Sequence, residues 1–171
     1  MNKSASLEIV RDKVSVRSLA NWVLQLAQRE GLPITNMALN KLVYFLVEKV
    51  LIERRRLITD AKIEAWEHGP VFRELYQQFK VFGEKPISEK ARYFDISDGE
   101  LKSAVPAVPA DLSAELEAFI RPLLPWSAAR LRALSHVIDG PWHRVWAYDG
   151  FANPGMEITP EKILDRGEAD G

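Results

Sequence analysis

Three histidines, His68, His136 and His143, are the side chains of this chain best suited to acid–base or metal chemistry. Imidazole titrates near neutral pH and is a common metal ligand. His136, Asp139 and His143 lie in one short segment and could form a facial ligand set. The Gly140-Pro141 pair interrupts that segment, however, so the three side chains cannot share one regular helix face. The sequence therefore favours structural histidines, with a metal-dependent or other small enzyme built around His68, His136 and His143 as an alternative.

The sequence lacks the other common catalytic and cofactor-binding motifs. The chain has no Cys, so disulfides, thiolate nucleophiles and Cys-ligated zinc are excluded. It also has no Gly-Lys phosphate loop, no dinucleotide-binding glycine motif, no nucleophile elbow and no His-Glu-x-x-His helix. Carboxylates are scattered along expected surface faces, and no pair is set in apolar sequence that would separate two pKa values. We predict that the protein is not an enzyme and carries no metal or cofactor.

The Arg54-Arg55-Arg56 cluster raises the alternative of a DNA-binding regulator. The whole chain offers little support for it, since 23 Lys and Arg nearly balance 24 Asp and Glu and one triplet supplies few phosphate contacts. The preceding helix, expected from Thr35 to Arg56, is filled with large apolar residues rather than basic ones. The triplet is better interpreted as a solvated cluster at the negative end of that helix. Nucleic acid is not the expected partner.

Four of the five tryptophans lie beside turn residues, namely Trp66, Trp126, Trp142 and Trp146. Such residues are either core anchors at the ends of elements or aromatic hot spots of an interface. We favour the core for Trp66 and Trp142.

The elements that position these residues are mainly helices. Apolar residues recur at helical spacing from Val16 to Gly31, with Ser15 as the N-cap, and again from Thr35 or Asn36, where they cover so much of the circumference that the helix should be central. Later helices are expected after Asp111, after Ser127 and from Thr159-Pro160. The predicted fold class is mainly α, a single-domain helical bundle with a small β-hairpin or short β element.

The β element is expected in the middle of the chain. Alternation from Ala61 to Trp66 predicts a short strand, followed by a tight turn at Gly69 and a new helix beginning at Pro70. The segment 84–110 is weakly patterned, with a possible second short strand at 92–96. A chain of 171 residues suits one core.

No apolar run approaches the length needed to cross a bilayer, and residues 1–14 lack the apolar core of a signal peptide. Together with the lack of Cys, this favours a cytoplasmic location and no membrane partner.

Three segments together resemble the Panacea-domain antitoxin family. They are residues 39–45 (LNKLVYF), 63–71 (IEAWEHGPV) and 75–80 (LYQQFK). The later Leu134-Ser135-His136 and Gly140-Pro141-Trp142 resemble the family's second landmark, in the same order and at matching spacing. The resemblance covers residues 16 to 164.

The resemblance implies a helical domain with a small β element that neutralises a cognate toxin, encoded nearby, by direct binding. For one branch of the family it further implies a proteolytic adaptor that presents the toxin to the ClpXP protease. The implied organisation is an N-terminal extension (1–15), the antitoxin domain (16–165) and a polar C-terminal tail (166–171). The motif positions, expected to shape the scaffold or contact the partner, are Lys41, Tyr44, Glu64, Trp66, His68, Gly69, Pro70, Tyr76, His136, Pro141 and Trp142.

This chain departs from the family pattern at two places. Residues 46–51 (LVEKVL) replace an aromatic stretch after the first motif, which puts a binding role for that helix face in doubt. Ser135 replaces the usual Thr before His136, which preserves the hydroxyl.

Overall fold

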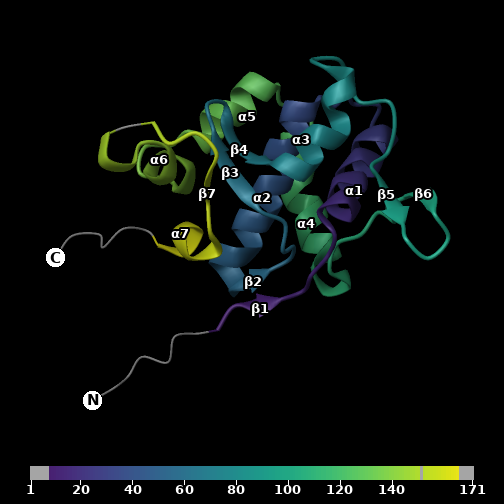
Figure 1. Ribbon diagram of the computed structural model, residues 1–171, viewed down its shortest axis with the longest axis horizontal. Helices are drawn as coiled ribbons and strands as arrows, with labels where there is room; N and C mark the ends of the chain where they lie inside the picture. Colours follow the sequence, from purple (N-terminus) through teal and green to yellow (C-terminus); the bar gives the residue numbers. More distant parts are fainter. Residues whose placement is uncertain (1–7, 151, 166–171) are drawn as a thin grey trace.

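A computed structural model describes residues 8–150 and 152–165 (Figure 1). Helices dominate, which confirms the predicted fold class. The α-helices are α1 (Val16–Arg29), α2 (Asn36–Arg54), α3 (Arg73–Phe79), α4 (Ser113–Ile120), α5 (Ala128–Ser135), α6 (Pro141–Trp146) and α7 (Pro160–Leu164). The strands are β1 (Val10–Arg11), β2 (Arg56–Leu57), β3 (Ile63–Trp66), β4 (Gly69–Phe72), β5 (Arg92–Asp95), β6 (Glu100–Ser103) and β7 (Met156–Glu157). Among the described residues, no helix is both long and apolar enough to cross a bilayer.

Helix α2 is the centre of the molecule, as its sequence predicts. It packs against α1, α3, α4, α5, α7 and β4, which surround it in Figure 1. Nearly every side chain from Ala38 to Val47 is buried, so the helix has no solvated face in its middle. The predicted caps hold as well, since Thr35 Oγ1 accepts from the Ala38 N–H and Ser15 Oγ from the Arg17 N–H.

A three-stranded antiparallel sheet, in the order β4-β3-β7, lies beside α2. Strands β3 and β4 pair from Ile63↔Phe72 to Trp66↔Gly69 across a two-residue turn. The prediction that Pro70 begins a helix is wrong, because residues 69–72 form β4 and the helix starts at Arg73. Pro70 is tolerated because β4 is an edge strand, where a residue without an N–H removes no ladder bond. Strand β7 lacks any signal in the sequence.

The hairpin β5–β6 projects from the body on the side of α1 (Figure 1). The sequence suggests its first strand only. Both arms are exposed, with Phe94 60%, Leu101 66% and Ile96 90% accessible, and within the described chain β5 and β6 pair only with each other. Its base is held by the fully buried Asn21 of α1, which donates to the Ala91 and Ala104 carbonyls (3.0 and 2.8 Å) and accepts from the Ala91 N–H (2.7 Å).

The arginine cluster is tied into the fold instead of being simply solvated. Arg56 is only about a fifth exposed and pairs with Asp12 (2.8 Å) and Asp111 (2.6 Å), while Arg54 pairs with Glu115 (2.8 Å). Asp111 therefore does not cap the next helix, which begins at Ser113 without a side-chain cap. The parallel pair β1–β2 brings residues 10 and 11 against the same end of α2.

Candidate functional site

The motif residues from four separate segments meet between α2, the β3–β4 hairpin, α5 and α6. Lys41 comes from α2, Gly69 and Pro70 from β4, His136 from the end of α5 and Trp142 from α6. The resemblance groups these positions by motif, and the fold brings them into one cluster. Arg132 and Ser135 of α5 also belong to it, although neither is among the site residues predicted from the sequence.

Lys41 is the buried base of the cluster. Its side chain is 1% exposed, and Nζ donates to the Pro70 carbonyl oxygen at 2.9 Å. Among the described residues it forms no ion pair with a carboxylate. Burial, followed by the positive charge of Arg132, lowers the pKa of Lys41 to about 7. A buried cation that relies on one carbonyl is unusual and marks a functional candidate.

Gly69 allows the approach of Lys41 to the hairpin. Its φ of +109° is a conformation that L side chains rarely adopt. A Cβ at this position would lie 2.6 Å from Ser135 Oγ and 2.7 Å from Lys41 Cε. Ser135 in turn donates to the Arg132 carbonyl at 2.7 Å. Position 69 must therefore be glycine for both local and tertiary reasons.

Trp142 joins α6 to the hairpin. Its Nε1–H donates to the Trp66 carbonyl oxygen at 2.7 Å, and its ring stacks on His136 at 3.7 Å with an interplanar angle of 4°. Burial, followed by the charges of Arg132 and Lys41, lowers the pKa of His136 to about 4. His136 is thus neutral at physiological pH, and its role in the cluster is to pack.

Glu64 organises the outer side of the hairpin. It accepts from Trp66 Nε1 (2.9 Å) and Arg73 Nε (3.0 Å). Burial raises the pKa of Glu64, but these two hydrogen bonds and the positive charges of Arg73 and Lys62 together lower it. Trp66 also meets Tyr76 edge-on at 4.7 Å. Glu64 is therefore an ionised structural acceptor.

Three further motif positions lie outside the hydrogen-bonded cluster. Tyr44 is buried elsewhere on α2, and burial, then the Glu48 carboxylate, raises its pKa well above the usual value. Pro141 occupies the first turn of α6. His68 lies exposed in the β3–β4 turn.

The three histidines are not brought together as a ligand set. His143 Nδ1 accepts from the Asp139 N–H at 3.2 Å, whereas His136 is stacked on Trp142. Within residues 8–150 and 152–165, no group of three His, Asp or Glu side chains could hold a metal ion.

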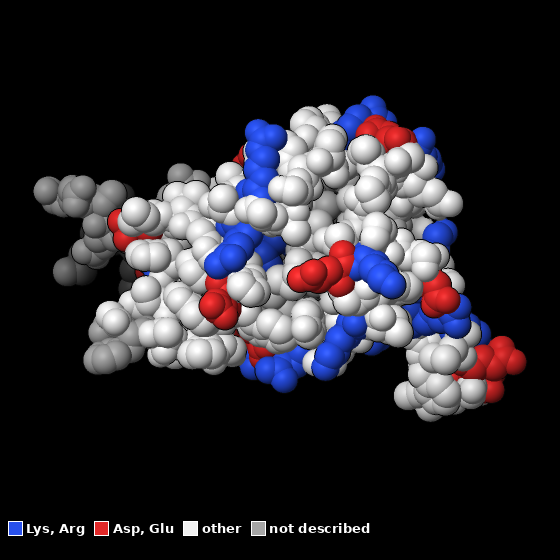
Figure 2. Space-filling view, turned by 90° about the horizontal axis from the view of Figure 1, so that it is seen from above, with Lys and Arg blue, Asp and Glu red and all other residues white. Residues whose placement is uncertain are grey.

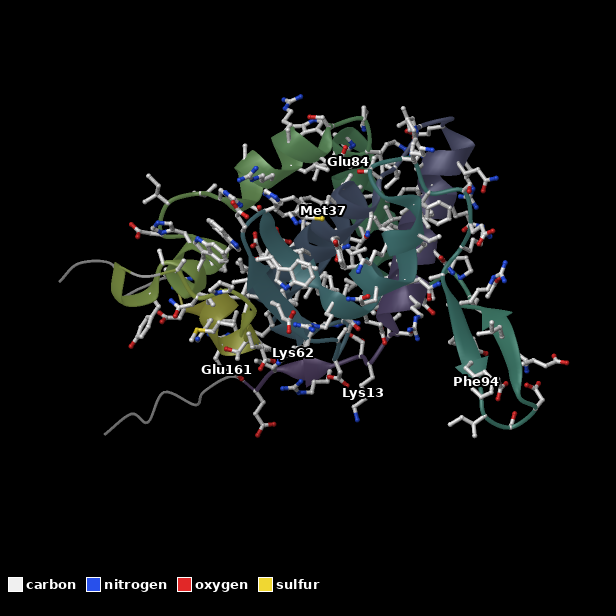
Figure 3. The ribbon with its side chains drawn as sticks, turned by 45° about the horizontal axis from the view of Figure 1, so that its top comes forward. Lys13, Met37, Lys62, Glu84, Phe94 and Glu161 are labelled. Carbon is white, nitrogen blue, oxygen red and sulfur yellow. The ribbon has the colours of Figure 1, made fainter. Side chains whose placement is uncertain are left out.

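Two cavities open beside the cluster. The first, about 200 Å³, is lined by Lys41, Arg132, His68, Met37, Ala128 and Ala129. The second, about 380 Å³, shares Met37 and His68 with it and continues past Trp66 and Tyr76 to Lys80 and Glu84. Figure 3 shows Met37 and Glu84 on the same side of the molecule. Because Met37 and His68 line both cavities, the two adjoin; together they are called the groove, with Lys41 and Arg132 at its basic end.

Comparison with known proteins assigns the chain to a family. Residues 39–143 match the family model described as "Antitoxin SocA-like, Panacea domain". The chain is also 34% identical, over 154 residues, to Antitoxin SocA of Caulobacter vibrioides, and the match covers 90% of this chain and 82% of that protein. No solved structure matches. Because the family match spans well over half of the chain and includes the whole cluster, the protein belongs to the Panacea-domain family of SocA-like antitoxins.

Proposed function

We propose that this protein neutralises a cognate toxin protein, encoded nearby, by binding it directly. The observation that carries the proposal is the 34% identity to Antitoxin SocA over 90% of the chain. The geometry agrees with a binding role, because Glu64, Ser135 and Trp142 are engaged in hydrogen bonds that hold the scaffold together. A rigid frame of this kind leaves partner choice to the surface around it.

The distribution of surface charge gives little support to the alternative of a DNA-binding regulator. On the face seen in Figure 2, blue and red side chains are interspersed and no continuous basic stripe runs across it. Arg54 and Arg56 are already paired with carboxylates of this chain, which reduces the charge available for phosphate contacts. A protein partner fits this mixed surface better.

A finer version of the proposal is a proteolytic adaptor that holds the toxin and presents it to ClpXP, acting in the cytoplasm. An adaptor needs a second contact surface, which can be small once the toxin is tethered. The charged Arg54–Arg56 cluster and the polar tail 166–171, which lies outside the described residues, are the two candidate surfaces for this contact. Since Arg54 and Arg56 serve intramolecular ion pairs, Arg55 is the appropriate residue of the cluster to reverse.

The test is co-expression of this protein with the product of the adjacent open reading frame. Growth should be restored and the two proteins should co-purify at a fixed stoichiometry. Growth rescue without a complex would overturn direct binding. For the adaptor, toxin half-life is measured with purified ClpXP, and no acceleration by the wild-type protein would reduce it to a simple neutraliser.

A further inference from the structure

The basic end of the groove contains two cations without acidic partners. Lys41 lies buried at its base and Arg132 at its exposed rim. In the part of the chain that the structure describes, neither side chain forms an ion pair. Arg73 and Arg144, by contrast, pair with Glu64 and Asp165. An uncompensated buried cation costs free energy, which a bound anion would recover.

The N-terminus of helix α5 adds positive electrostatic potential to the same cavity, which favours an anion there. Ala128 and Ala129, its first two residues, line the wall. Ser127 Oγ accepts from the Arg130 N–H, but the first N–H groups of a helix have no acceptor within the helix. The positive end of the helix dipole therefore lies beside Lys41 and Arg132.

The rest of the groove indicates what kind of molecule carries the anion. Beyond Met37 and His68 the lining turns aromatic and mixed in charge, with Trp66 and Tyr76 followed by Glu67, Lys80 and Glu84. A polyphosphate or nucleic-acid backbone would meet acidic side chains here. A polypeptide that carries one carboxylate followed by apolar residues meets Lys41 and Arg132 at the basic end and the rings of Trp66 and Tyr76 beyond it.

We propose that the Lys41–Arg132 cavity binds the carboxylate of an Asp or Glu side chain of the toxin, and that the adjoining Trp66–Tyr76 cavity takes the residues next to it. This inference rests on the proposed function, because it identifies the partner as the toxin. The cavity itself is a carboxylate site that can be probed without that partner.

The first experiment uses acetate and inorganic phosphate on the free protein, followed by NMR of the Lys41 side chain. Acetate should move the Lys41 titration midpoint upward from about 7, because a bound anion favours the ammonium form. The shift should disappear in Arg132→Ala and persist in Arg130→Ala. Arg130 is a matched control because it lies on the same helix but stacks on Trp126 at 3.6 Å. No shift with acetate would overturn the site.

The second experiment measures toxin affinity by calorimetry. Arg132→Glu should weaken binding at least tenfold, while Arg130→Glu stays within about twofold of wild type, since an exposed charge outside the contact contributes little. A toxin variant whose contacting Asp or Glu is changed to Lys should restore binding to Arg132→Glu. Equal affinities for both protein variants would overturn the site as the toxin contact. Failure of the wild type to bind the toxin would instead overturn the proposed function.

Proton uptake on toxin binding tests Lys41 directly, because a lysine with a purely structural role would not change its protonation when the toxin binds. Binding should take up a proton near pH 8 in the wild type and not in Lys41→Met. Arg132 of α5 and His68 of the β3–β4 turn line the same cavity, and His136 is close enough to Lys41 for the lysine charge to lower its pKa. His68→Gln therefore serves as the control and should retain the uptake. A site that responds to phosphate, with toxin affinity independent of Arg132, would overturn the protein carboxylate in favour of a free oxyanion.

Discussion

Lys41 shows how one residue can serve a site at a cost to the fold. A lysine that is fully buried loses its hydration, and a single carbonyl acceptor replaces only part of it. Helix α2 holds the residue in place through the apolar packing around it, so the rest of the core must offset this cost. The result is an ammonium group whose ionisation is coupled to folding.

We predict that the stability of the wild-type protein rises from pH 7 towards pH 10. The unfolded Lys41 binds a proton up to its ordinary pKa of 10.5, whereas the folded one releases it near 7. Between these values the unfolded state holds more protons, so the free energy of unfolding gains up to about 1.4 kcal/mol per pH unit from this residue. Urea unfolding of wild type and Lys41→Met at several pH values checks this. Identical pH slopes would contradict it.

Trp142 is the clearest test of a scaffold role. Trp142→Phe keeps an aromatic ring against His136 but leaves the Trp66 carbonyl without its donor, so we expect a loss of about 1–2 kcal/mol in unfolding free energy. Trp142→Ala should cost about 3–5 kcal/mol. Chemical denaturation measures both, with Trp126→Phe as a control at a half-buried tryptophan. Unchanged stability of Trp142→Ala with lost toxin binding would place Trp142 in the interface.

At the scale of elements, one buried amide, that of Asn21, joins the base of the β5–β6 hairpin to α1. Isolated two-stranded hairpins are marginal in water, and this one has exposed apolar residues on its arms. Asn21 satisfies both Ala91 and Ala104 at its base, which fixes the direction of the arms relative to α1. The hairpin is therefore presented in one orientation although its arms touch little else.

We predict that Asn21→Ala loosens the hairpin before the rest of the fold. Three hydrogen bonds would be lost, but the Ala91 carbonyl keeps the Ala104 N–H as a donor. The Ala91 N–H and the Ala104 carbonyl lose their Asn21 partner, at about 1–3 kcal/mol for each group left unsatisfied. Amides 92–103 should exchange hydrogen faster, while amides of α2 keep most of their protection. Gln28→Ala, on the exposed face of the same helix, is the control. Uniform acceleration across the chain would show that Asn21 supports the whole core instead.

At the scale of the whole molecule, one core built on α2 connects every layer. The contacts of α1, α3, α4, α5, α7 and β4 with this helix make it difficult for any layer to unfold alone. The β1–β2 pair and the ion pairs of Arg56 tie residues 10–12 to the same core. Such an arrangement favours a single cooperative transition.

We predict that the free protein is folded before it meets its toxin. Thermal unfolding of the protein alone should be cooperative, with far-UV and near-UV circular dichroism changing together, because secondary structure and packing share one core. A free protein that gains its helical signal only after toxin is added would contradict a preformed binding surface.

The sequence alone determined most of the helices, the central position of α2 and the family of the protein. Helical periodicity and capping residues located α1, α2, α5 and α7, because caps and amphipathic spacing act within a few residues. The all-round apolar character of α2 determined that it is central. The two motifs indicated the antitoxin family, which the comparisons confirm.

Contacts between distant segments were decided only by the tertiary structure. Strand β7 is two residues long and exists because β3 offers it an edge, and Pro70 lies in a strand because pairing with Ala65 outweighs the preference of proline for a helix start. Arg56 and Asp111 pair across 55 residues of sequence, which displaces Asp111 from the capping role that local sequence suggests. The Lys41–Arg132 cavity likewise depends on α2, the β3–β4 turn and α5 meeting in space, and burial of a charged residue cannot be read from its neighbours along the chain.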